Sequence, residues 1–141
     1  MHFHSHIPHM IRHLLWIDCG AAWLAGTVML LFSDALERLL GLPVQLLLFA
    51  GAMNLLYGTG SCTLALRAQR PLPLIGVLVG ANLVWAALCV GLGLHFAGTA
   101  THWGLIQLFA EALFVGGLAC LEWRYRERLR VRTKAAQWAT D

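Results

Sequence analysis

A single acidic residue, Glu111, lies near the middle of an apolar stretch that runs from His102 to Trp123. A carboxyl group in such surroundings can hold a proton, bind a cation or anchor the polar end of a ligand, and ionisable residues inside membrane helices commonly have such roles. It can equally be a structural hydrogen-bond partner for a neighbouring helix. Because apolar surroundings disfavour the charged form, we expect Glu111 to be protonated much of the time.

The other apolar stretches also carry polar or amphipathic side chains, spaced three or four residues apart so that they share one face of a helix. If these faces turn inward, amide and phenol groups reach the Glu111 carboxyl, and they can hydrogen-bond it in either protonation state. We therefore predict one polar pocket for a proton, a cation or an amphipathic small molecule, formed by Glu111, Asn54, Asn82, Tyr57, Gln107 and Trp85. Asp18 lies close to the start of its stretch, and we expect it to be solvated or to pair with Arg12 or His13.

The composition indicates where such a pocket is built. The chain has 141 residues, of which 59% are hydrophobic and 12% are charged. Soluble domains carry about 25% charged residues, and a small soluble domain cannot bury this much apolar surface. The composition therefore predicts an integral membrane protein.

Four apolar runs have the length of roughly 20 residues that a membrane-spanning helix needs. A backbone in lipid must satisfy its own hydrogen bonds, so each run is expected to be a helix. We predict an all-α, four-helix antiparallel transmembrane bundle over residues 14–123, with helices at about 14–32, 44–66, 72–94 and 103–123. A histidine-rich leader, residues 1–13, precedes it, and a basic tail, residues 124–141, follows it.

Basic residues lie on alternate connections of this chain. They occur before the first run, between the second and third, and in the tail, whereas the other two connections hold only Arg38. Because cytoplasmic connections are enriched in lysine and arginine, we predict that both termini are cytoplasmic. The tail arginines alternate with other residues, which spreads their charge around a helix. We expect the tail to attract anionic lipid and not nucleic acid.

Histidines are the other candidate ligands. His9 and His13 are four residues apart, and His95 and His102 flank one outer connection, so either pair is a weak candidate for metal, or the second for haem. The leader lacks cysteine and acidic partners, and a solvated interfacial segment is the preferred interpretation. The pair His95 and His102 is expected at the membrane rim, where histidine is common.

Cysteine occurs once in each apolar run, as Cys19, Cys62, Cys89 and Cys120, and no C-x-x-C motif is present. Three of the four fall toward the reducing cytoplasmic side, so we interpret the cysteines as small packing residues. Gly104 and the Gly76-x-x-x-Gly80 pair allow close approach of helices, either within the bundle or to a partner. No nucleophile, phosphate-loop or zinc-hydrolase motif appears, which argues against an enzyme.

Three segments, "ALERLLGLP", "GANLVWA" and the acid-bearing last run ending in "LEWRYR", resemble small four-helix integral membrane proteins of bacteria. The shared positions are chiefly Leu42-Pro43, Asn82 and Trp85. This resemblance implies a four-helix bundle in the bacterial inner membrane and no particular activity. The chain lacks the early first-helix glutamate of small multidrug exporters and the cysteine pairs of disulfide-forming and vitamin K epoxide reductase-like membrane proteins.

Three classes of function remain open. The first is a binding or transport module built on the polar pocket. The second is an accessory subunit or assembly factor that docks onto a larger membrane complex, and the third is a metal- or haem-dependent membrane enzyme. We rank them in that order. The sequence indicates no particular cofactor, and its short length is compatible with a homo-oligomer.

Overall fold

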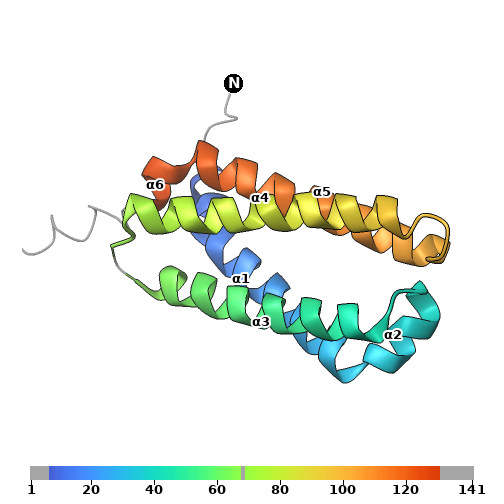
Figure 1. Ribbon diagram of the computed structural model, residues 1–141. Coiled ribbons are helices and arrows are strands. Elements are labelled where there is room, and N and C mark those ends of the chain that lie inside the picture. The colour runs from blue at the N-terminus through green and yellow to red at the C-terminus, as the bar shows by residue number, and fades with distance from the viewer. Residues whose placement is uncertain (1–6, 68, 131–141) are drawn as a thin grey trace, which may run out of the picture.

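The computed structural model describes residues 7–67 and 69–130, and within them the fold is all-α (Figure 1). The histidines of residues 1–6 and the tail residues 131–141 lie outside the described part of the chain. The helices are α1 (Ile7–Leu31), α2 (Ser33–Leu40), α3 (Val44–Leu66), α4 (Leu72–His95), α5 (His102–Arg124) and α6 (Arg126–Arg130).

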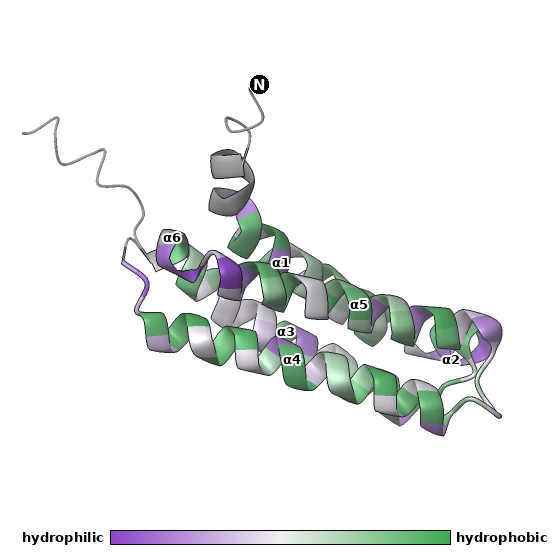
Figure 2. Ribbon diagram, turned by 90° about the horizontal axis from the view of Figure 1, so that it is seen from above, coloured by the Kyte–Doolittle hydropathy of each residue, from purple (hydrophilic) through white to green (hydrophobic). Residues whose placement is uncertain are grey.

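Four of these helices, α1, α3, α4 and α5, are long and apolar enough to cross a membrane, which confirms the predicted fold class and a multi-pass architecture. Figure 2 shows hydrophobic residues along most of these helices, with hydrophilic ones at both ends and some between. Large apolar side chains point outward, for example Leu31, which is 72% exposed, and Leu113, which is 79% exposed. Such a surface suits lipid.

The four long helices form two closely packed antiparallel pairs, α1 with α3 and α4 with α5. In the first pair the helices approach at glycines. A Cβ atom on Gly58 would lie 2.7 Å from the Trp23 ring, and one on Gly26 would lie 2.8 Å from the carbonyl oxygen of Gly51. Close contact runs along each pair, whereas the two pairs meet through the short helices at the ends and through fewer contacts of α1 with α5.

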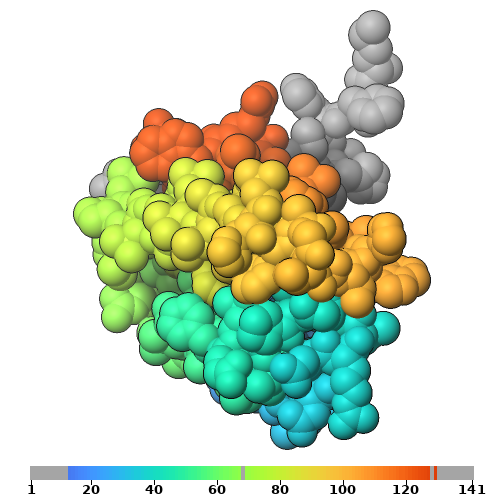
Figure 3. All heavy atoms as spheres, turned by 45° about the vertical axis from the view of Figure 1, so that its right-hand side comes forward, coloured from blue at the N-terminus to red at the C-terminus, as the bar shows by residue number. Residues whose placement is uncertain are grey.

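At one end, the segment predicted as a simple connection between the first two membrane helices contains a helix of its own, α2. Its sequence, SDALERLL, places charged residues on one face and leucines on the other, which suits an interfacial position. Gly41 ends the helix with φ of 65°, a left-handed conformation that glycine adopts most readily. Figure 3 shows α2 lying against the turn between α4 and α5.

Gly104 allows α5 to approach the end of α2 closely. The Thr101 amide donates to the Leu40 carbonyl oxygen at 3.0 Å, and its hydroxyl donates to the Leu39 carbonyl at 2.8 Å. A Cβ atom on Gly104 would meet the same Leu40 carbonyl oxygen. The close approach expected at Gly104 therefore occurs within the bundle, whereas Gly76 and Gly80 have no such neighbour within 4 Å.

At the other end, α6 folds back over the bundle core. Leu129 is 1% exposed and packs among buried residues of α1, α3, α4 and α5. The Arg70 guanidinium fastens this arrangement, since it donates to the carbonyl oxygens of Ala65 at 2.8 Å, Leu64 at 3.1 Å and Leu129 at 3.4 Å. The first residues of the basic tail are thus part of the folded bundle.

We predict that Gly104→Ala destabilises the protein by about 1–3 kcal/mol, the usual penalty for forcing an atom into a packed contact. The contact is with backbone, so α5 must move away from α2. The free energy of unfolding in detergent, measured by denaturant titration, checks this.

Gly91→Ala is the matched control, because nothing lies within 4 Å of its Cβ position. This variant should be neutral or slightly stabilising, since alanine favours helix over glycine. Equal stability of the two variants would contradict the close approach at Gly104.

Candidate functional site

A cavity of about 250 Å³ lies between the two helix pairs and is lined by residues of α1, α3, α4 and α5. All six residues predicted to form the polar pocket line it, together with Asp18. The rest of its wall is apolar. The predicted convergence of these side chains is thus present, although the contacts within it differ from those expected.

Glu111 is bonded within its own helix pair. The indole Nε1 of Trp85 donates to Glu111 Oε1 at 2.7 Å, and the Gln107 amide lies 3.5 Å from Oε2. Contacts of Glu111 with Asn54, Asn82 or Tyr57, which the sequence led us to expect, do not form, because those side chains bond elsewhere. Glu111 is half-buried and Gln107 is exposed, so this carboxyl lies at the accessible side of the cavity.

Asp18 contradicts the expectation that it would be solvated. It is 4% exposed, and its Oδ2 accepts hydrogen bonds from the Tyr57 hydroxyl at 2.5 Å and the Ser61 hydroxyl at 2.9 Å. The prediction was wrong because α1 begins at Ile7, several residues earlier than expected, which places Asp18 near the middle of its helix. Short bonds to a carboxylate are among the strong ones in proteins.

Glu122 is a buried carboxyl that the sequence reasoning did not include in the pocket. It is fully buried, and the Asn82 amide donates to its Oε2 at 3.3 Å. Its second oxygen, Oε1, is buried without a hydrogen-bond partner. Glu122 lies eleven residues after Glu111, almost three helical turns, so both acids lie on the same face of α5. This spacing is the sequence signal that could have pointed to Glu122. The burial was missed because Glu122 lies two residues from the end of α5, where the aqueous boundary is expected.

Asn54 lines the cavity but does not bond to the other polar residues. Its amide nitrogen donates to the carbonyl oxygen of Ala50, one turn back in α3, at 3.0 Å. The amide therefore contributes a polar surface to the cavity wall without joining α3 to another helix.

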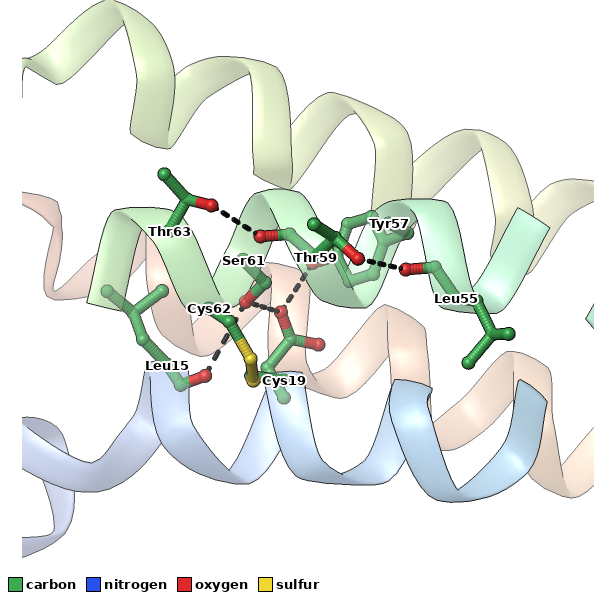
Figure 4. The surroundings of a disulfide bond; sticks show 9 residues. Leu15, Cys19, Leu55, Tyr57, Thr59, Ser61, Cys62 and Thr63 are labelled. Atoms are coloured by element: carbon green, nitrogen blue, oxygen red, sulfur yellow. Dashed lines mark hydrogen bonds between the residues drawn. A yellow bond between two sulfur atoms is a disulfide. The ribbon is translucent and has the colours of Figure 1, made fainter. Parts of the chain in front are cut away.

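Cys19 and Cys62 form a disulfide between α1 and α3, with their Cα atoms 5.2 Å apart (Figure 4). Their interpretation as packing residues was therefore wrong. The small residues at the interface of α1 and α3 bring the two backbones within the distance that a disulfide needs. Cys89 is buried and Cys120 is exposed, and both are free thiols.

The described candidate metal ligands lie at the two opposite ends of the bundle. His95 and His102 are both exposed at the turn between α4 and α5, and His95 packs edge-on against the Phe96 ring. His13 is exposed at the other end, and the His9 side chain lies outside what the structure describes. Among the described residues, no group of three or more metal-ligating side chains has the proximity to hold an ion.

Comparison of the chain with protein families, curated proteins and solved structures finds no match in any of the three. The site must therefore be interpreted from its own chemistry.

We predict that the bond between Tyr57 and Asp18 couples α1 to α3 by about 1–2 kcal/mol, the upper part of the range for polar contacts between membrane helices. A double-mutant cycle with Tyr57→Phe and Asp18→Asn, which preserve side-chain shape, measures this coupling in the free energy of unfolding.

Thr63→Val is the control on the same helix. The Thr63 hydroxyl is exposed and bonds only to the Thr59 carbonyl one turn back, so its loss should change stability by less than about 0.5 kcal/mol. A coupling energy near zero for Tyr57 and Asp18 would contradict the geometry.

Proposed function

We propose that the protein binds a small amphipathic cation in the cavity between its two helix pairs. The observation that carries this proposal is the charge of the wall: Asp18 and Glu111 line the cavity, and no lysine, arginine or histidine of residues 7–67 or 69–130 does. A cation that enters such a site gains the attraction of nearby acids in apolar surroundings, where that attraction is weakly screened.

The shape and composition of the wall support the same class of ligand. The aromatic rings of Tyr57, Trp85 and Phe114 lie around the cavity, and aromatic faces attract cations while also packing against apolar groups. A cavity of about 150 Å³ holds a benzene molecule, so the volume of about 250 Å³ suits a ring with a small charged substituent.

A second hollow supports access from the lipid. A groove of about 340 Å³ runs between α3 and α4, and it shares Tyr57 and Ala81 with the cavity. Apart from Arg67, Thr63 and the Tyr57 hydroxyl, its walls are apolar. An amphipathic molecule dissolved in the membrane would reach the acids through this groove, which favours binding or transport of a membrane-soluble cation over that of a hydrated metal ion.

The proposed location is a bacterial inner membrane, with both termini in the cytoplasm. The described arginines Arg67, Arg70, Arg124 and Arg126 lie toward the end of the bundle that carries the start of α1, the α3–α4 connection and α6 (Figure 1). The opposite end carries Arg38 beside Asp34 and Glu37. This asymmetry supports the orientation through the positive-inside rule.

The test uses benzyltrimethylammonium and its uncharged isostere neopentylbenzene, titrated calorimetrically into the detergent-purified protein. We expect the cation to bind at least about tenfold more tightly than the isostere, since about 1.4 kcal/mol of cation–π and charge attraction suffices for that ratio. Equal affinity for the two probes, or no binding of the cation, would overturn the proposal.

Glu111→Gln should weaken binding of the cation by about tenfold or more, because it replaces a carboxyl group that can be negative beside a bound cation with a neutral amide, and it keeps an oxygen for the Trp85 indole. Leu113→Ala is the matched control two residues along α5, where the side chain is 79% exposed on the outer surface. It should leave the affinity unchanged.

A further inference from the structure

Deeper than Glu111, two further acids approach each other from opposite helix pairs. Asp18 of α1 and Glu122 of α5 are both buried, and they lie close enough to repel each other when both are ionised. Asn82 of α4 lies at the same place, with its amide donating to Glu122 Oε2 at 3.3 Å. Asp18 and Asn82 line the cavity, whereas Glu122 lies behind them.

Glu122 is poorly supported as a charged group. Its carboxyl is fully buried and receives one long hydrogen bond, and Oε1 has no partner. A buried carboxylate oxygen without a donor is strongly unfavourable, whereas a neutral carboxyl in the same position loses far less hydration. A proton on Glu122 therefore removes the energetic penalty of a buried carboxylate oxygen that has no donor.

Asp18 is buried as well, but it is better supplied with hydrogen-bond donors. The hydroxyls of Tyr57 and Ser61 both donate to its Oδ2, at 2.5 and 2.9 Å, and two such donors favour the ionised form. The contrast between the two acids assigns the negative charge to Asp18 and the proton to Glu122.

The other described polar and charged groups around Asp18 and Glu122 do not form an ion pair with either acid. Tyr57 lies within electrostatic range of both acids and is a donor to Asp18. Arg70 directs its guanidinium to backbone carbonyls of α3 and α6, Tyr125 packs at the edge of the same core, and Glu127 is exposed. Among the described residues, no basic side chain forms an ion pair with Asp18 or Glu122.

We propose that Asp18 and Glu122 hold one exchangeable proton between them, and that a cation entering the cavity displaces it. This second step rests on the proposed function. When the cation lies beside Asp18, its charge offsets the negative charge of that group, so Glu122 can ionise without facing an uncompensated carboxylate. The exchange is electrically balanced, because one positive charge enters the site and one proton leaves it to the solvent.

The experiment measures proton release when benzyltrimethylammonium binds to the purified full-length protein. This probe does not titrate, so any proton comes from the protein. Calorimetry in buffers of different ionisation enthalpy counts the protons. We expect about one proton per bound cation, and an affinity that rises about tenfold per pH unit while Glu122 is protonated. Binding without proton release and without pH dependence would overturn the coupling.

Glu122→Gln is the decisive variant, because glutamine is a neutral analogue of the protonated acid. It should bind the cation with little proton release and little dependence on pH. Glu127→Gln, an exposed position on α6, is the matched control and should behave as the unmodified protein. Unchanged proton release in Glu122→Gln would assign the proton to another group and overturn the inference.

Infrared difference spectroscopy on the unmodified protein gives a measurement that does not depend on any variant folding. Cation binding should remove the carbonyl band of a protonated carboxyl and add a carboxylate band, and an unchanged carboxyl region would overturn the proposal. The two proposals fail separately. If no cation binds but this band disappears at high pH, and is absent in Glu122→Gln, the proton site stands and the ligand proposal falls. If the cation binds but the carboxyl band remains, the ligand proposal stands and the proton-site proposal falls.

Discussion

Buried carboxyl groups in an apolar bundle must find hydrogen-bond donors on neighbouring helices, because lipid offers none. Each closely packed helix pair meets this requirement in the same way, with the acid on one helix and the donor on the other. The bonds are those of Tyr57 and Ser61 to Asp18 in the pair α1–α3, and those of Asn82 to Glu122 and Trp85 to Glu111 in the pair α4–α5. The hydrogen bonds that these acids accept therefore hold the two helices of each pair together.

The same rule explains why the cavity lies where it does. Along the middle of the bundle, the bonds of Tyr57 and Ser61 to Asp18 and of Trp85 to Glu111 stay within a pair, whereas Asn82 of α4 also bonds to Asp18 and Tyr57 of the other pair. The two pairs meet in addition through α2 and α6 at the ends and through contacts of α1 with α5. Polar groups from both pairs therefore line the space between them.

Much of this arrangement follows from the sequence because the membrane simplifies the problem. An apolar run of the right length must be a helix, so the spans were predictable to within a few residues except at the start of α1. Polar residues in such helices face inward, so the convergence of Glu111, Asn82 and Tyr57 on one cavity was predictable too. Which donor each acid selects was not, because helical spacing defines a face and leaves open which helices are neighbours. Here α3 packs on α1 and not closely on α4.

One group of features that sequence reasoning missed depends on how the chain folds at the ends of the bundle. Glu122 lies two residues from the end of α5, a position that suggests the aqueous boundary. Leu129 inserts into the core and α6 packs against α4, so the end of the helix in the sequence is not the end of the bundle in space. Glu122 is fully buried although it lies near that end, and its Oε1 has no hydrogen-bond partner. The buried carboxyl with the fewest hydrogen bonds thus lies close to the acid that lines the cavity, and the proposed proton site rests on this proximity.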